Sequence, residues 1–229
     1  MSGSVPILTI DGPSGSGKGT ISRLVAMRLG WQLLDSGALY RLVALAGKQA
    51  GLAAEDVAGH ARVAGNMQVR FATAPDGGEQ VLLGSPEQDV TAALRSEEAG
   101  QGASRVAAWP PIREALFERQ RAFARPPGLV ADGRDMGTVV FPGAEVKIFL
   151  TASAEERAQR RYKQLKDKGS GASLAALSLE IAERDRRDST RAVAPLKPAA
   201  DAVLVDSTGL SIEAVVDRVL AELAARGLS

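Results

Sequence analysis

The sequence predicts an α/β protein of three layers, in which a five-stranded parallel sheet carries helices on both faces. Two observations predict this fold. Short apolar runs alternate along the chain with segments whose apolar residues recur every three or four positions, as buried strands alternate with amphipathic helices. In addition, the first run leads directly into a glycine-rich segment that ends in lysine and begins a helical pattern. Ligands of such sheets bind at the carboxyl ends of the strands, so candidate binding residues should follow the runs.

Five apolar runs are the predicted strands, and three stretches show clear helical spacing. The strands are expected at residues 5–10, 31–34, 129–131, 146–150 and 202–205. Apolar residues at helical spacing follow the first strand at Ile21, Leu24, Val25 and Leu29, and the second strand at Leu39, Leu42, Val43 and Ala46. The same spacing occurs at the end of the chain, at Ile212, Val215, Val216, Val219, Leu220 and Leu223.

Two segments interrupt this alternation within what we expect to be one domain, residues 1–229. Residues 64–103 contain two strand-like runs, 67–71 and 80–83, on either side of a turn-rich stretch. This pattern predicts a β-hairpin and therefore an inserted antiparallel subdomain, although a surface excursion without a function is the alternative. Residues 151–191 are rich in arginine and contain the glycine loop 168–171, which predicts a mobile lid with a hinge.

The composition excludes several classes of protein. The chain has 229 residues, a net charge of +1 and no cysteine, so disulfides, thiol catalysis and cysteine metal sites are excluded. A charge near zero provides no overall field for nucleic acid or an anionic membrane, and no apolar stretch is long enough to span a bilayer. We expect a cytoplasmic monomer. The one histidine, His60, lies in a polar stretch away from every motif, which predicts a surface position and no catalytic role.

The glycine-rich segment after the first strand has the spelling of a phosphate-binding loop. Residues 12–20 read G-P-S-G-S-G-K-G-T. Glycines let several backbone N–H groups converge on one anion, the following helix adds its positive dipole end, and the lysine adds a mobile charge. A flexible linker would not lie between a buried strand and an amphipathic helix. The predicted nucleoside triphosphate site comprises Gly12, Pro13, Ser14, Gly15, Ser16, Gly17, Lys18, Gly19 and Thr20.

The loop departs from the usual pattern at one position. Ser or Thr normally follows the lysine directly and holds Mg²⁺, whereas here Gly19 follows it and the hydroxyl comes one residue later, at Thr20. Thr20 is thus the candidate side-chain ligand for the metal, and water or phosphate oxygens can complete its shell.

Charged side chains follow two further strands and fill two predicted helices. Residues 35–41 contain Ser36 and Arg41 beyond the second strand, and residues 132–135 bring three charges to the end of the third. A helix N-cap is the alternative role for Ser36. In 155–161 and 183–191, arginines recur at helical spacing. The first set is Arg157, Arg160 and Arg161, and the second face carries Arg184, Asp188 and Arg191. Solvated ion pairs are the alternative, but arginine forks favour phosphate binding.

Taken together, these motifs resemble those of the bacterial cytidylate kinases (CMP/dCMP kinases). The resemblance runs through 12–20, L-L-D-S-G-A-L-Y-R at 33–41, residues 104–123, A-D-G-R-D-M-G-T-V-V-F-P at 131–142 and R-D-x-x-R-A-V-A-P-L at 187–196. It implies a P-loop kinase fold in which 64–103 is the subdomain that binds the nucleoside monophosphate. It further implies in-line phosphoryl transfer from Mg-ATP to CMP and dCMP, which yields CDP and dCDP.

The same resemblance implies a role for each candidate residue. Lys18 and the loop backbone would hold the ATP phosphates, and Arg157, Arg160 and Arg161 would face ATP from the lid. Arg41, Arg134 and Arg191 would grip the CMP phosphate. Ser104, Arg113 and Asp135 would read the cytosine edge with Ser36 close by, and Arg184 with Asp188 would lie at the ribose. Charge that develops on the transferred phosphoryl group would be stabilised by Lys18, Arg134, Arg157, Arg160 and Arg191.

Two other classes of function remain open from the sequence. One is a P-loop kinase for another acceptor, such as UMP, AMP or shikimate, although Ser104, Arg113 and Asp135 argue against it. The other is a nucleotide-dependent switch or nucleic-acid-binding regulator. Such a switch is expected to carry Ser or Thr directly after the loop lysine and an N-K-x-D motif, and the sequence has neither.

Overall fold

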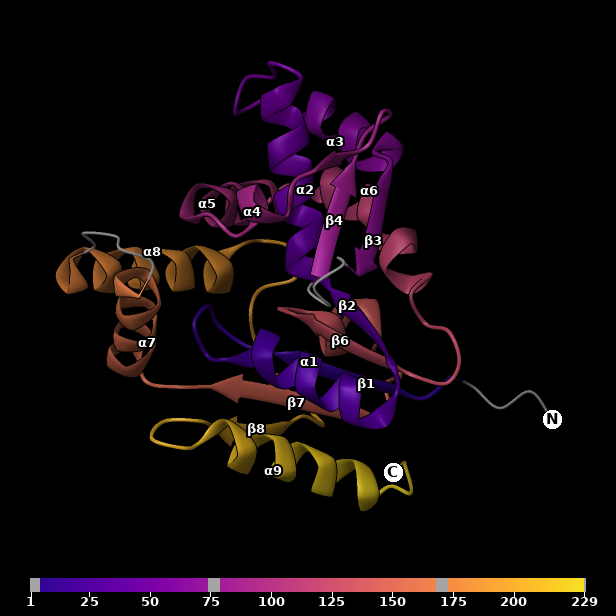
Figure 1. Ribbon diagram of the computed structural model, residues 1–229, viewed down its shortest axis with the longest axis vertical. Helices are drawn as coiled ribbons and strands as arrows, with labels where there is room; N and C mark the ends of the chain where they lie inside the picture. Colours follow the sequence, from indigo (N-terminus) through magenta and orange to yellow (C-terminus); the bar gives the residue numbers. More distant parts are fainter. Residues whose placement is uncertain (1–4, 74–78, 168–172, 229) are drawn as a thin grey trace. The chain divides into compact units, whose positions relative to one another are not determined.

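The computed structural model describes residues 5–73, 79–167 and 173–228 (Figure 1). The chain divides into two compact units, the first formed by residues 1–35 together with 120–229 and the second by residues 36–119. The predicted hairpin turn, 74–78, and the predicted hinge loop, 168–171, fall outside the described residues.

A five-stranded, all-parallel sheet forms the centre of the first unit, as predicted. Its strands are β1 (Ile7–Asp11), β2 (Gln32–Asp35), β6 (Leu129–Gly133), β7 (Val146–Thr151) and β8 (Val203–Asp206), in the spatial order β2-β6-β1-β7-β8. The register places Asp11 opposite Gly133 and Asp35 opposite Asp132. The carboxyl ends of β1, β2 and β6 therefore meet at one edge, and they bring three aspartates to it.

Helices of the first unit bury the apolar side of this sheet. α1 (Lys18–Leu29) and α9 (Ile212–Ala224) contact each other and lie along the strands (Figure 1). Their apolar faces share one core with the strands, in which Leu8, Val25, Ile148, Val216 and Leu223 are almost wholly buried. Each such side chain contributes about 1.5–3 kcal/mol on burial. The helical spacing of the apolar residues within α1 and α9 predicted both helices.

Three further helices of the first unit lie near the charged motifs. A short π-helix, η1 (Met136–Val140), follows β6 directly. α7 (Ala154–Lys166) follows β7, with Ser153 accepting a hydrogen bond from Glu156 N as its N-cap. α8 (Leu174–Thr190) packs against α7. Among the described residues no helix is both long and apolar enough to cross a bilayer.

The second unit combines helices with a small antiparallel sheet. Its helices are α2 (Ser36–Gln49), α3 (Val57–Asn66), α4 (Thr91–Leu94), α5 (Glu97–Val106) and α6 (Pro110–Arg121), which runs two residues past the boundary. The predicted hairpin is present as β3 (Val69–Thr73) paired with β4 (Glu79–Leu83). A third strand, β5 (Gln88–Asp89), was not predicted because its two residues are polar. The predicted insertion 64–103 lies within this unit, and its boundaries stay a prediction.

The surface position predicted for His60 is wrong. Its side chain is 4% exposed and meets Trp109 edge-on, with 5.7 Å between the ring centroids. Its Nδ1 lies 2.8 Å from the carbonyl oxygen of Asp56, and a Cβ at Gly47 would come within 2.4 Å of its Nε2. Because Gly47 and Trp109 are remote from His60 in the chain, local polarity could not reveal this buried contact.

A candidate nucleotide site at the carboxyl edge of the sheet

The loop between β1 and α1 has a backbone that requires glycine. Gly12 adopts φ 154°, and a Cβ there would lie 2.0 Å from the carbonyl oxygen of Leu150. Gly17 has φ 92° and precedes α1 in the left-handed conformation. The loop thereby turns sharply at the carboxyl edge of the sheet and leads into the first turn of α1. A helix N-terminus behind a glycine loop is the arrangement that favours an anion.

Lys18, from which the sequence predicts a mobile charge, is buried in this structure. It is 8% exposed, and its Nζ donates to the carbonyl oxygen of Pro13 at 3.0 Å. Burial lowers the pKa of Lys18 to about 7, the charge of Arg134 acts in the same direction, and Asp132 partly opposes both. Because its pKa is lowered, the buried amine of Lys18 is partly neutral near pH 7, and a bound anion would favour its protonated form.

Two arginines of α7 reach back to the loop. Arg157 is 5% exposed and donates to the carbonyl oxygens of Ala152 and Ser14, at 3.1 and 3.0 Å. Arg160 donates to the carbonyl oxygen of Ser16 at 3.3 Å. The arginines predicted to face ATP thus hold carbonyl groups of the loop itself in this structure.

Other contacts of Arg157 and Arg160 tie the loop to two more elements. Arg157 Nη2 lies 2.6 Å from the Asp185 carboxylate on α8. Arg160 donates to the backbone and hydroxyl oxygens of Ser207, at 2.7 and 3.1 Å, just after β8. Sequence reasoning missed Asp185 and Ser207, since no spacing pattern connects them to the loop. Arg161 points elsewhere, with Nη1 3.4 Å from the side-chain oxygen of Gln164.

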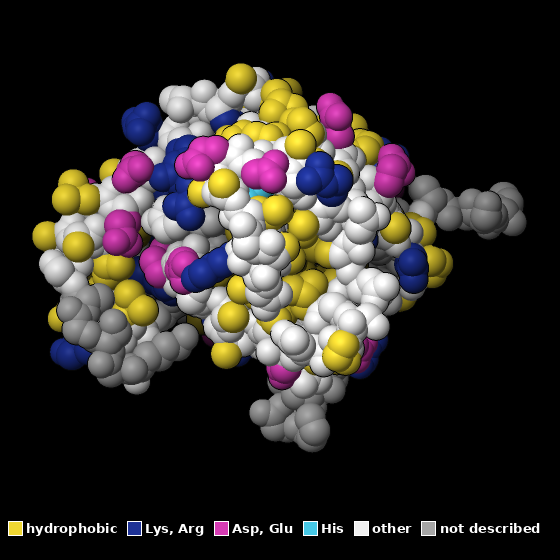
Figure 2. Space-filling view, turned by 90° about the horizontal axis from the view of Figure 1, so that it is seen from above, with side chains coloured by type: hydrophobic (Ala, Val, Ile, Leu, Met, Phe, Trp, Pro, Cys, Tyr) yellow, Lys and Arg dark blue, Asp and Glu magenta, His cyan; other side chains and the backbone are white. Residues whose placement is uncertain are grey.

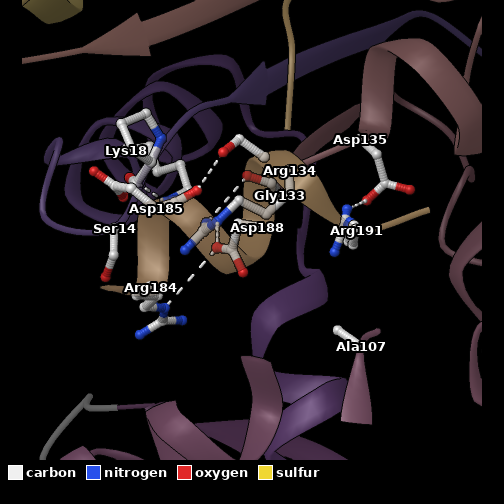
Figure 3. Close-up of polar contacts among 12 residues, drawn as sticks. Ser14, Lys18, Ala107, Gly133, Arg134, Asp135, Arg184, Asp185, Asp188 and Arg191 are labelled. Atoms are coloured by element: carbon white, nitrogen blue, oxygen red, sulfur yellow. Dashed lines mark hydrogen bonds and ion pairs between the residues drawn. The ribbon is translucent and has the colours of Figure 1, made fainter. Parts of the chain in front are cut away.

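An ion cluster joins α8 to the turn after β6 (Figure 3). Arg134 Nε donates to Asp188 at 3.0 Å, and Arg184 Nε lies 4.0 Å from the same carboxylate. The three side chains are at most 18% exposed. Two guanidinium groups beside one buried carboxylate can also donate to a ligand that carries negative charge.

A second buried pair lies beside this cluster. Arg191 Nη2 is 3.4 Å from the Asp135 carboxylate, and the side chains are 5% and 3% exposed (Figure 3). The expectation that Arg191 shares a helical face with Arg184 and Asp188 is wrong, because α8 ends at Thr190 and Arg191 is extended.

The turn after α8 is held in an uncommon conformation. Ala194 adopts φ 51°, the left-handed region that non-glycine residues seldom occupy. Arg191 Nε donates to the carbonyl oxygen of Ala194, and Leu196 N donates to that of Asp188 at 2.8 Å. Backbone strain of this kind persists where the surroundings enforce it, and here it fixes the direction of the Arg191 side chain.

The other predicted site residues belong to the second unit. Ser36 begins α2 and is 4% exposed, and Ser104 on α5 is 6% exposed. Arg113 on α6 donates to the carbonyl oxygen of Ala107 at 3.3 Å and lies 5.7 Å from the ring centroid of Tyr40. Arg41 on α2 has a buried Nε without a hydrogen-bond partner. A buried guanidinium nitrogen in that state is a candidate donor for a ligand.

The described residues contain no group of three or more His, Cys, Asp or Glu side chains that could hold a metal ion. Thr20 is exposed in the first turn of α1. The face seen in Figure 2 mixes acidic and basic side chains without a broad area of one sign.

A phosphate loop after the central strand of a parallel sheet, with buried arginines beside it, defines a phosphotransferase of the P-loop kinase class. The sequence model of cytidylate kinase matches residues 8–225. The chain belongs to the cytidylate kinase family, and it is accordingly a nucleoside monophosphate kinase.

Individual relatives agree over nearly the whole chain. Cytidylate kinase of Pseudomonas savastanoi pv. phaseolicola (strain 1448A / Race 6) is 58% identical over 225 residues, which are 98% of this chain and 97% of that protein. Cytidylate kinase of Azotobacter vinelandii (strain DJ / ATCC BAA-1303) is 57% identical over 223 residues, 97% of each chain. A solved gluconokinase from Sinorhizobium meliloti 1021 has 18% identity and a TM-score of 0.47, with 96% of this chain and 92% of that chain covered.

Proposed function

We propose that this chain transfers the γ-phosphoryl group of ATP to CMP and dCMP. The observation that carries the proposal is the position of the buried Asp135–Arg191 pair one residue from Arg134, at the same sheet edge as Lys18 and the phosphate loop. Together with Arg134, the pair offers both a base-reading carboxylate and phosphate-binding cations within a chain of the cytidylate kinase family.

On the donor side, the loop backbone and the α1 N-terminus bind the phosphates of ATP, and Lys18 neutralises charge that develops on the transferred group. Mg²⁺ supplies further neutralisation when it is bound with the nucleotide, with Thr20 as the candidate side-chain ligand. Arg157 and Arg160 keep the loop in place through its carbonyl groups. For them to contact ATP, these hydrogen bonds would have to be exchanged.

On the acceptor side, Arg134 and Arg191 bind the CMP phosphate, which is already an oxyanion, so the reaction requires no general base. Asp188 and Arg184 bind the sugar hydroxyls. Both ribose and deoxyribose have a 3′-hydroxyl, so both CMP and dCMP are substrates. The roles of Ser36, Arg41, Ser104 and Arg113 in binding CMP stay predictions, as do the lid at 151–191 and the role of the insertion.

Asp135 is proposed to select cytosine. A carboxylate can accept from the exocyclic amine of cytosine while it pairs with Arg191, because each oxygen has two lone pairs. Uracil presents a carbonyl at that position, so the same carboxylate repels it. Nucleic acid and membranes are not proposed as partners, and we propose that the chain acts as a cytoplasmic monomer.

The test is an acceptor panel with Asp135→Asn beside the wild type. ADP release with Mg-ATP is measured for CMP, dCMP, UMP, AMP and GMP. We expect the wild type to use CMP and dCMP selectively, and D135N to lower the ratio of kcat/KM for CMP over UMP at least tenfold. Asp217→Asn, an exposed carboxylate on α9 paired with Arg28, is the control and should leave the ratio unchanged. Equal turnover of UMP by the wild type, or equal losses for both acceptors in D135N, would contradict the role of Asp135.

Nucleotide binding should also be accompanied by proton uptake at alkaline pH. The pKa of Lys18 is about 7 without a ligand, so at pH 8.5 its amine is largely neutral. The phosphates of ATP raise this pKa, and the complex should take up close to one proton. Titration calorimetry at pH 8.5 in buffers of different ionisation enthalpy measures the uptake. It should be absent in Lys18→Met, and equal uptake by the two proteins would assign the proton to another group.

A further inference from the structure

Asp11, the last residue of β1, joins the phosphate loop to the turn that carries Arg134 and Asp135. Its side chain is 5% exposed, and its two carboxylate oxygens each accept one backbone hydrogen bond at 2.8 Å. The donors are the N–H groups of Met136 and Gly137, which open η1 directly after Asp135. Gly12, the next residue along the chain from Asp11, begins the phosphate loop.

An ionised, buried carboxylate at Asp11 lowers the free energy of unfolding. No ion pair to Asp11 occurs among the residues that the structure describes. The pKa of Asp11 is raised to about 7, chiefly by burial; the two backbone hydrogen bonds lower it, and the nearby carboxylates of Asp135 and Asp132 raise it. A buried carboxyl group without a cation is retained at the expense of stability, which points to a role beyond packing.

The start of η1, to which Asp11 is hydrogen-bonded, is also in close contact with β1 and β7. A Cβ at Gly137 would lie 2.8 Å from Thr9 Oγ1 and 3.2 Å from Cδ of Lys147, so the backbone there is in close contact with β1 and β7. Lys147 Nζ donates to the carbonyl oxygen of Pro142 at 2.6 Å and pairs with Asp201 at 2.8 Å. With both flanks held, the two hydrogen bonds of Asp11 set where η1 begins.

We infer that Asp11 is a positioning residue that places Asp135 and Arg134 relative to the phosphate loop, and thereby sets the selection of the acceptor base. The inference rests on the proposed function for its catalytic consequence. It explains why a carboxylate lies at this point: two adjacent N–H donors need two acceptor oxygens, which Asp provides and Asn does not. An asparagine would keep one hydrogen bond and direct its NH₂ group at the other N–H.

The decisive variant is Asp11→Asn, with Asp217→Asn as the matched surface control. We expect D11N to raise the KM for CMP at least tenfold and to reduce the kcat/KM preference for CMP over UMP, while the Kd for Mg-ATP changes less than twofold. Hydrogen exchange without any substrate should accelerate in a peptide spanning residues 133–140 and stay unchanged in α9. Parallel losses of ATP and CMP binding, or unchanged exchange at 133–140, would overturn the positioning role.

A measurement on the wild type covers the case in which D11N does not fold. The amide signals of Met136 and Gly137 should shift together between pH 5 and 8.5, with one midpoint near the Asp11 pKa of about 7. Asp132 and Asp135 are the charged neighbours that influence this titration. Amide shifts that do not follow a common titration would overturn the inference. Because the exchange and amide measurements use no acceptor, they separate this inference from the assignment of CMP as substrate.

Discussion

Replacing Lys18 with methionine is expected to lower kcat/KM for CMP about a thousandfold, equivalent to about 4 kcal/mol of transition-state stabilisation. Methionine keeps an unbranched apolar stem in a site that is 8% exposed, so the packing is retained while the amine is removed. The amine is the one charge that the phosphate loop itself brings to the transferred group. ADP release at saturating Mg-ATP and varied CMP measures the effect.

The matched control for this variant is Lys48→Met. Lys48 is near the end of α2, and its side chain is 67% exposed in an ion pair with Glu98. Its removal should change kcat/KM less than twofold, because exposed ion pairs contribute little. If K18M retained more than a tenth of the wild-type activity, the assignment of the phosphate loop would be wrong.

Stability against pH provides a second readout for K18M that does not depend on activity. The pKa of Lys18 falls from 10.5 unfolded to about 7 folded, so between these values the unfolded chain binds more protons. The free energy of unfolding contributed by this group therefore rises from about pH 7 toward pH 10, and it is lowest below pH 7. Denaturant titrations across this range should show the rise in the wild type and lack it in K18M.

Periodicity and spacing predicted the parallel sheet and the phosphate loop because both depend on short-range pattern. Strand β1 lies in a largely apolar run, a Cβ at Gly12 would clash with the backbone of Leu150, and Gly17 has a φ that other residues rarely adopt. The sheet edge followed from topology alone, since parallel strands align their carboxyl ends. These elements depend on short segments of the sequence and not on contacts between distant residues.

Burial and pairing of charged residues could not be predicted in the same way. Nothing in the neighbourhood of Lys18 or His60 marks them as buried, because their cover comes from residues remote in the sequence. Likewise Arg157 was expected to face a ligand, and its partners Ser14 and Asp185 lie 143 and 28 positions away. Helical spacing indicates which side of a helix an arginine occupies, but tertiary structure decides what that side meets.

Replacing Arg191 with alanine is expected to cost both activity and stability. The Arg191–Asp135 pair has side chains that are 5% and 3% exposed, so removal of the guanidinium breaks a buried ion pair. Breaking such a pair costs about 3–5 kcal/mol of folding free energy. Loss of a phosphate-binding arginine should lower kcat/KM for CMP about a thousandfold as well. Arg226→Ala, which breaks an i,i+4 pair with Glu222 near the end of the chain, is the control.

The double variant Asp135→Asn/Arg191→Ala separates these two effects. Asparagine at position 135 no longer buries a charge, so the double variant should recover most of the stability lost in R191A. It should recover no activity, because both the base-reading carboxylate and the phosphate-binding cation are then missing. Denaturant unfolding and ADP release, measured on the same samples, test the two halves of this expectation. Recovery of activity together with stability would mean that Arg191 serves only to neutralise Asp135, and would remove it from the proposed phosphate site.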